Sequence, residues 1–124
     1  MTKRMVLIAV WVAMGFVQSG AGLAGESPDL VAGARKEAKV VVYSSTDSAS
    51  VEPLLQDFKS VYPFLQVEYN DLNTTEIYNR FVAETAAGTG TADFLWSSAM
   101  DLQLQLASKG SALTYASPEI SGLP

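Results

Sequence analysis

The chain has 124 residues, of which 48% are hydrophobic, and a net charge of −5 with no His and no Cys. Without these two residue types there can be no Ser-His-Asp or Cys-His nucleophile pair, no zinc site built on His or Cys, and no disulfide. The excess of acidic residues also makes nucleic acid a poor partner, because neutralising phosphates requires clustered Lys and Arg.

The first 24 residues have the order of segments that a secretory signal peptide has. Lys3 and Arg4 precede an uncharged apolar run over 5–17, and small residues follow up to Ala24. The run is too short to span a bilayer comfortably. We therefore predict a signal peptide over 1–24 that is cleaved near Ala24. A buried core helix and an uncleaved anchor are the alternatives, and a lipoprotein signal would need a Cys.

Residues 25–124 are then a normal length for one domain, and a short helix opens it. Ser27 suits the N-cap and Pro28 the first helical position, and the helix is predicted to end near Lys39. The apolar, β-branched run over 40–43 comes next. Such runs are typical of strands that are covered on both faces in a parallel sheet.

A polar cluster over 44–50 separates this strand from the second predicted helix. Apolar residues recur at helical spacing over 51–62, and Pro63 ends that pattern. Pro53 is compatible with this helix only if it lies in the first turn. Apolar and polar residues then alternate over 65–69, which predicts a second strand.

A turn and a capped helix follow the second strand. Asn70 and Asp71 are predicted to start the turn. Asn73 and Glu76 have the spacing of a capping box, which predicts a helix that begins there. Gly residues within 88–91 are expected to end this helix.

The last part of the chain contains one strand and one ambiguous segment. The strand is predicted over 92–96, and the spacing from Ser98 to Asp101 again fits a capping box. Leu residues alternate over 102–106, which suits a strand, yet two of them are one helical turn apart. The capping signal and the helix-forming residue types favour a helix that Gly110 ends. A further extended piece is predicted over 112–115.

The alternation of helices and strands predicts an α/β fold, in which helices cover a parallel sheet on both faces and form three layers. In open sheets of this class, ligands bind beyond the carboxyl ends of the strands. The strand-to-helix loops at 44–50, 70–75 and 97–99 would all lie there, and each is rich in Ser, Thr or Asn. Each leads into a helix N-terminus, where free N–H groups and the helix dipole favour an anion.

These loops also have a purely structural interpretation, because Ser, Thr, Asn and Asp are the usual N-caps. Ser44 and Ser45 precede the expected cap, so that capping alone does not require both, and we take them as candidate ligand-binding residues. For Asn73 we favour the capping role. Of Ser97 and Ser98, we expect one to cap the helix and the other to be free.

Other side chains near these loops are assigned structural roles. Asp47 is expected to stabilise a helix start rather than to bind a cation. The aromatic residues are expected to be core or rim residues; they are Tyr43, Tyr69, Tyr78 and Trp96. The Gly-x-Gly over 88–90 precedes a strand, so it does not predict a phosphate loop.

Four segments resemble one protein family. LVAGARKEAKVVVYSST (30–46) resembles the start of the extracellular solute-binding proteins of ABC importers, in the type II periplasmic binding branch that includes ferric-ion binders. EYNDLN (68–73), YNRF (78–81) and TADFLWSSAMDLQ (91–103) resemble more closely the subgroup that contains the phosphoglycerate transport regulatory proteins. The resemblance extends over roughly 30–119.

Membership of this family implies two α/β lobes joined by hinge strands, with a ligand clamped between them. The closed form of such a monomer is presented in the periplasm to an ABC permease of the inner membrane, and no cofactor takes part. By this resemblance, the first lobe would touch the ligand through Ser44, Ser45, Thr46, Ser97 and Ser98.

The resemblance also leads us to expect that a second lobe is missing and that ferric iron is the less favoured ligand. The chain matches only the first lobe and the start of a hinge, so we expect a fragment whose second lobe is missing. Residues 44–47 contain no His, which makes ferric iron less expected than a small phosphorylated or carboxylated anion.

Three alternatives stay open from the sequence. The first is a periplasmic regulator whose closed form contacts a sensor kinase. The second is a fragment of an exported hydrolase, which would need a pair of carboxylates with a perturbed pKa. The third is a defunct fragment that does not fold alone.

Overall fold

A computed structural model of the chain describes residues 27–90, 92–117, 120 and 122. The predicted signal peptide over 1–24 lies outside the described residues. Within them, helices and strands alternate in the predicted order, from helix α1 to helix α4. None of the helices in this part of the chain is long and apolar enough to cross a membrane.

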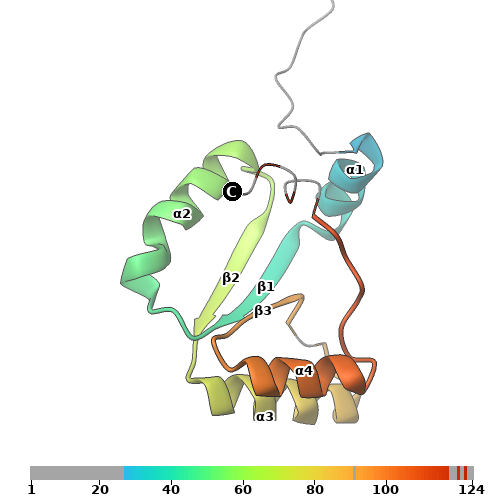
Figure 1. Cartoon of the computed structure of the whole chain (residues 1–124). Helices are drawn as coiled ribbons and strands as arrows, with labels where there is room; N and C mark the ends of the chain where they lie inside the picture. The colour runs from blue at the N-terminus through green and yellow to red at the C-terminus, as the bar shows by residue number, and fades with distance from the viewer. Residues whose placement is uncertain (1–26, 91, 118–119, 121, 123–124) are drawn as a thin grey trace, which may run out of the picture.

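The centre of the fold is a three-stranded parallel sheet. β1 (Lys39–Ser44) lies between β2 (Gln66–Asp71) and β3 (Phe94–Trp96). In Figure 1, α2 lies along β2 on one side of the sheet, while α3 and α4 lie side by side on the other side. The predicted α/β fold with a parallel sheet flanked by helices is therefore confirmed.

The first helix begins as its sequence predicts and ends two residues before Lys39, which is already the first residue of β1. α1 (Pro28–Glu37) has Ser27 as its N-cap, whose hydroxyl accepts a 3.1 Å hydrogen bond from the N–H of Leu30. Ala38 ends the helix in the left-handed region, at φ 60°. The guanidinium of Arg35 lies 3.9 Å from the ring centre of Phe64, which fixes α1 near the turn between α2 and β2.

The second helix begins earlier than its apolar pattern indicated. α2 (Ser48–Val61) has Asp47 as its N-cap, so Pro53 is the sixth helical residue and lies beyond the first turn. The requirement that Pro53 lie in the first turn was therefore wrong. Because Pro has no N–H, the carbonyl four residues earlier has no helical partner. The strong cap and the burial of Val51 at 2% exposure hold this helix start in place.

The second strand is longer than predicted, and its extension reaches the site region. β2 continues through Asn70 and Asp71, which the sequence had assigned to a turn. Both residues pair with β1, with Asn70 opposite Tyr43 and Asp71 opposite Ser44. Turn-forming residue types are a weak signal when a neighbouring strand offers hydrogen bonds to their backbone.

The last two helices pack against each other on one face of the sheet. α3 (Thr74–Ala87) carries the predicted capping box between Asn73 and Glu76, and Gly88 ends it at φ 67°. α4 (Met100–Ser108) confirms the helical interpretation of the Leu-rich segment, and Leu106 is only 5% exposed. No strand is found over 112–115.

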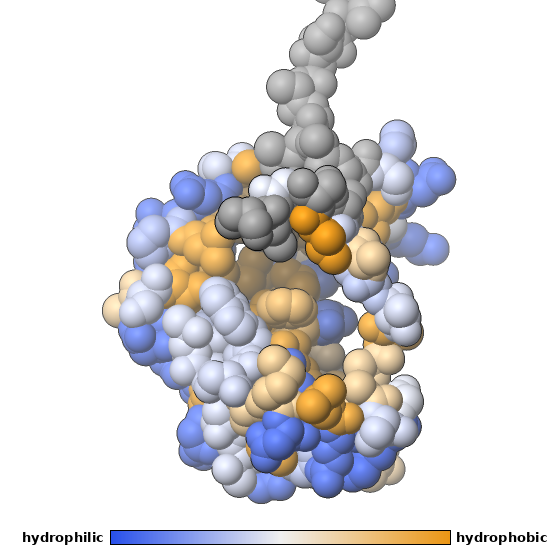
Figure 2. Space-filling view, in the orientation of Figure 1, coloured by the Kyte–Doolittle hydropathy of each residue, from blue (hydrophilic) through white to orange (hydrophobic). Residues whose placement is uncertain are grey.

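The apolar core lies mainly between β1, α3 and α4. Its buried side chains come from four elements and are Tyr43, Val51, Ile77, Phe81 and Leu106. On the other face, Phe94 and Trp96 of β3 stay 55% and 38% exposed. Figure 2 shows apolar surface in the hollow between α2 and the lower helices.

Candidate functional site

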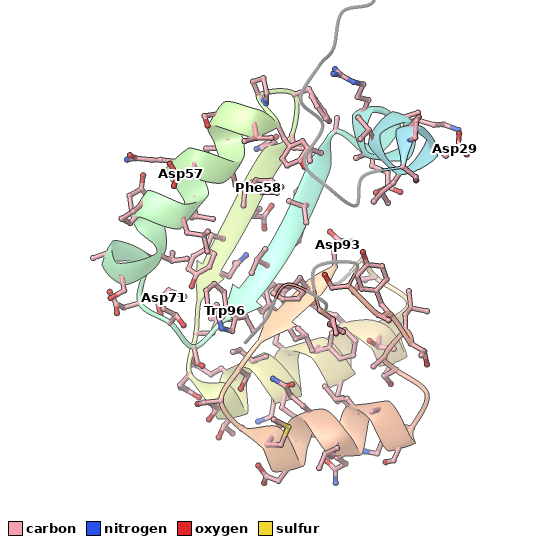
Figure 3. All side chains as sticks on the ribbon, turned by 45° about the horizontal axis from the view of Figure 1, so that its top comes forward. Asp29, Asp57, Phe58, Asp71, Asp93 and Trp96 are labelled. Carbon is pink, nitrogen blue, oxygen red and sulfur yellow. The ribbon has the colours of Figure 1, made fainter. Side chains whose placement is uncertain are left out.

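The three strands end side by side at one edge of the sheet. Ser44 at the end of β1 lies opposite both Asp71 of β2 and Trp96 of β3. The three polar loops therefore begin next to one another, as expected for parallel strands. Figure 3 shows Asp71 and Trp96 at this common edge, near the start of α2. We call this edge, with the loops that leave it, the carboxyl edge.

The loop after β1 is held by hydrogen bonds from both neighbouring strands. The N–H of Ser45 donates to the carbonyl of Trp96 at 3.0 Å, and the hydroxyl of Tyr69 donates to the carbonyl of Thr46 at 2.7 Å. The hydroxyl of Ser44 is 0% exposed and accepts from the N–H of Thr46 at 3.0 Å. Ser44 thus positions the loop from inside rather than facing solvent.

Ser45 and Thr46 have a different arrangement. Both are partly exposed, and their hydroxyls make no hydrogen bond with the part of the chain that the structure describes. Their backbones are fixed, so the two hydroxyls are presented from a rigid loop. Such preorganised groups bind a solute without first having to be ordered.

The N-terminus of α2 is occupied by two carboxylates of the chain itself. Asp47 accepts from the N–H of Ser50 at 2.9 Å and from its hydroxyl at 2.7 Å. Asp71 accepts from the N–H of Ser48 at 3.0 Å and, more weakly, from its hydroxyl at 3.4 Å. The expected capping role of Asp47 is confirmed. The amides of Ser48 and Ser50, which the sequence suggested would be free at this helix start, are therefore already bonded.

The loop after β3 differs from its sequence-based interpretation. The hydroxyl of Ser97 accepts from the N–H of Ala99 at 3.1 Å, and the Ser97 carbonyl accepts from the side-chain amide of Gln103. Ala99 occupies the N-cap position of α4, and no side chain caps this helix. The capping box predicted at Ser98 was therefore wrong, since the helix begins one residue too late for it.

Ser98 is consequently free to face solvent beside an uncapped helix start. Its side chain is exposed and makes no hydrogen bond with the described residues. By helix geometry, the first-turn N–H groups of Asp101 and Leu102 have no acceptor within α4. The carboxyl edge thus combines three free hydroxyls with one helix start that no side chain caps.

The electrostatics of this edge are set by carboxylates. Hydrogen bonds from the side chain and backbone of Ser50 hold the pKa of Asp47 below the ordinary value of a carboxyl group. Among the six basic residues in the described part of the chain, Arg80 alone bonds to this edge, through a long 3.5 Å hydrogen bond from its guanidinium to the side-chain oxygen of Asn70. A lowered pKa is also the opposite of what a general acid needs.

Sequence reasoning missed a polar cleft on the α3 side of the sheet. Its volume is about 480 Å³, and its walls come from the region of β1, β2, α3 and the approach to β3. Its lining residues are Glu37, Lys39, Val41, Tyr43, Glu68, Arg80, Glu84, Gly90 and Asp93. The run over 40–43 had been interpreted as covered on both faces, which left no room for such a cleft.

The charges in this cleft are largely paired with one another. Lys39 forms an ion pair with Glu68, and Arg80 forms one with Glu84 at 2.8 Å. The hydroxyl of Tyr43 lies 2.9 Å from Oε2 and 3.0 Å from Oε1 of Glu84. Burial and the Glu84 carboxylate raise the pKa of Tyr43. These pairs connect α3 to the sheet, which is a structural role.

No metal centre is evident in the described residues. They contain no group of three or more His, Cys, Asp or Glu side chains that could hold a metal ion. Hydroxyl and amide groups are instead the prominent donors at the carboxyl edge, and they suit hydrogen bonding to a small polar solute.

Solved structures that share sequence and fold with this chain include one of a transport protein. It is the crystal structure of the substrate binding protein of the ABC transporter from Agrobacterium tumefaciens, at 43% identity and a TM-score of 0.64. The match covers 69% of this chain and 25% of that protein, so this chain matches about a quarter of its length. No protein-family model matches, and no curated protein does. This similarity supports a general relationship between the chain and the substrate-binding proteins of ABC transporters.

Proposed function

We propose that this chain forms one wall of the solute site in an exported substrate-binding component of an ABC importer. The observation that carries the proposal is the carboxyl edge, where Ser45, Thr46 and Ser98 present free hydroxyls from loops fixed by the sheet. The 43% identity to a substrate-binding protein supports the same class. Ser44 and Ser97 belong to this wall as positioning residues, through their bonds to Thr46 and Ala99.

The solute is a small polar molecule, and an organic anion is the class that the loops favour. An anionic group would meet the start of α4, where the first-turn amides and the hydroxyl of Ser98 converge. Ser45 and Thr46 would bind its remaining polar groups. A second lobe would close over this wall and present the closed form to the permease.

A hydroxyl-deletion experiment tests the wall directly. The chain is titrated with a panel of small carboxylates and sugar phosphates, and binding is followed by the backbone amide shifts of 45–46 and 97–102. We expect Ser45→Ala combined with Thr46→Ala to weaken binding several-fold, because each lost hydrogen bond contributes about 0.5–1.5 kcal/mol. Ser111→Ala is the matched control, since Ser111 is an exposed Ser outside the edge.

The titration can also contradict the proposal. If the amide shifts occur around Arg80 and Glu84 instead of at the carboxyl edge, the solute binds in the polar cleft and the proposal is wrong. If the double variant and Ser111→Ala bind the solute equally well, the hydroxyls of Ser45 and Thr46 do not contribute to solute binding.

The proposed role at an ABC permease requires that the chain be exported. We infer that residues 1–24 direct the chain to the periplasm and are removed there, which is supported by the order of basic, apolar and small residues. Mass spectrometry of the exported protein should find an N-terminus just after Ala24. A cytoplasmic protein that still begins at Met1 would contradict this part of the proposal.

A further inference from the structure

Asp71 places a negative charge at the start of α2. It is the last residue of β2, it is exposed, and it lies opposite Ser44 in the ladder. Its Oδ2 atom accepts from the N–H of Ser48 at 3.0 Å, at the first residue of α2. The amide and the positive end of the helix dipole, which together make a helix start attractive to anions, are thus already engaged by the protein.

The neighbouring groups strengthen this effect. Asp47 bonds the amide of Ser50 in the same helix turn, so two carboxylates face one helix start. Arg80 donates to Asn70, the residue beside Asp71, but it makes no hydrogen bond or ion pair with Asp71 itself. A further anion close to Asp71 would therefore be repelled, and no basic side chain of the described residues bonds to Asp71 to offset the repulsion.

Asp71 has a second carboxylate oxygen, Oδ1, that is available as a hydrogen-bond acceptor. Both of its hydrogen bonds use Oδ2, and Oδ1 makes none with the described part of the chain. An exposed carboxylate oxygen that is held in place from one side accepts readily from a hydroxyl or an ammonium group. Asp71 thus offers an acceptor at the same sheet edge from which the loop with Ser45 and Thr46 leaves β1.

We propose that Asp71 is a specificity-determining residue, which makes the carboxyl edge take solutes that present an ammonium or hydroxyl group near α2 and reject phosphorylated ones there. This inference rests on the proposed function, because it assumes that the carboxyl edge is the solute site. It narrows the organic anion of that proposal to one whose anionic group lies away from α2. A sugar phosphate would fit this edge less well than a zwitterion or a hydroxy acid.

The test measures the binding of inorganic phosphate at the start of α2. The full chain and its variants are titrated with phosphate, and the amide of Ser48 is followed by NMR. We expect Asp71→Ala and Asp71→Asn to bind phosphate at least about fivefold more tightly than the unmodified chain, because a repelling charge is lost. The Asn variant retains an acceptor for Ser48, so it reports on the charge even if the Ala variant does not fold.

Asp57→Ala is the matched control. Asp57 lies on the same helix α2 but away from its start, as Figure 3 shows, and its loss changes the net charge by the same amount. Phosphate binding in this variant should equal that of the unmodified chain. The inference is overturned if neither Asp71 variant gains affinity at Ser48, or if Asp57→Ala gains as much. Because phosphate is the probe, the result is independent of whether the hydroxyl variants lose the transported solute.

Discussion

The hydroxyl of Tyr69 on β2 donates a 2.7 Å hydrogen bond to the carbonyl of Thr46, in the loop after β1. This bond joins two segments 23 residues apart and fixes the loop that carries the proposed ligand hydroxyls. Because both partners are partly buried, the carbonyl of Thr46 would lose its partner without gaining full access to water. The stability of the fold and the rigidity of this loop are therefore linked at Tyr69.

Tyr69→Phe should lower the free energy of unfolding by about 1 kcal/mol, the usual contribution of one such hydrogen bond. Urea denaturation measures this change, and amide exchange at Thr46 should become faster. Tyr115→Phe is the control, since Tyr115 is 74% exposed and its hydroxyl makes no bond with the described residues. Identical midpoints for the two variants would show that the Tyr69 bond contributes nothing.

Leu106→Ala should destabilise the fold far more than Leu104→Ala does. Both residues lie in α4, but Leu106 is 5% exposed and Leu104 is 63% exposed. Removing a buried Leu side chain costs about 2–5 kcal/mol through lost burial and the cavity that remains. Thermal or urea unfolding compares the two variants directly. Similar losses of stability in the two variants would mean that α4 does not bury the face that carries Leu106.

Asn73→Ala should cost about 1 kcal/mol of stability, because it removes the side chain that caps α3. The amide of Glu76 then loses its acceptor, and the Glu76 carboxylate keeps only its bond to the N–H of residue 73. Thr75→Ala is the control in the same helix turn and should leave stability nearly unchanged. A double variant that also carries Glu76→Ala should lose less than the sum of the single losses, since the two residues form one capping box.

The start of α2 should loosen in acid. Hydrogen bonds from Ser50 lower the pKa of Asp47, so the charged carboxylate stabilises the folded form. That contribution is fully present above the ordinary carboxyl pKa of about 3.9 and is lost as the pH falls through the lower pKa of Asp47. An NMR titration of the Ser50 amide should report this midpoint, and Asp47→Asn should abolish the transition. A midpoint at or above the ordinary value would contradict the prediction.

Local signals in the sequence succeeded where the interacting groups are close in the chain. The caps at Ser27, Asp47 and Asn73 each join a side chain to an amide three residues later. The same kind of signal failed at Ser98, where the loop made a different short-range bond at Ser97 and the helix began after Ala99. Several caps can compete within a few residues, and packing of the helix decides between them.

The position of the candidate site was predictable, but its chemistry was not. Three polar loops after three strands indicated the carboxyl edge, and the register from Ser44 to Asp71 and Trp96 brings them together. The burial of Ser44, which turns it into a positioning residue, depends on both neighbouring strands. The Asp71 carboxylate at the start of α2 had been assigned to a turn, because strand pairing outweighs turn propensity only once β1 is present.

The sequence by itself determined the order of the elements, the parallel α/β fold and most helix ends. These features depend on hydrogen bonds and apolar spacing within a few residues, which can be recognised along the chain. Only the tertiary structure decided which hydroxyls are free, which helix start is already bonded, and that no basic side chain of the described residues bonds to Asp71. Those properties arise from contacts between residues such as Ser48 and Asp71, 23 positions apart, whose meeting is fixed by strand register and helix packing.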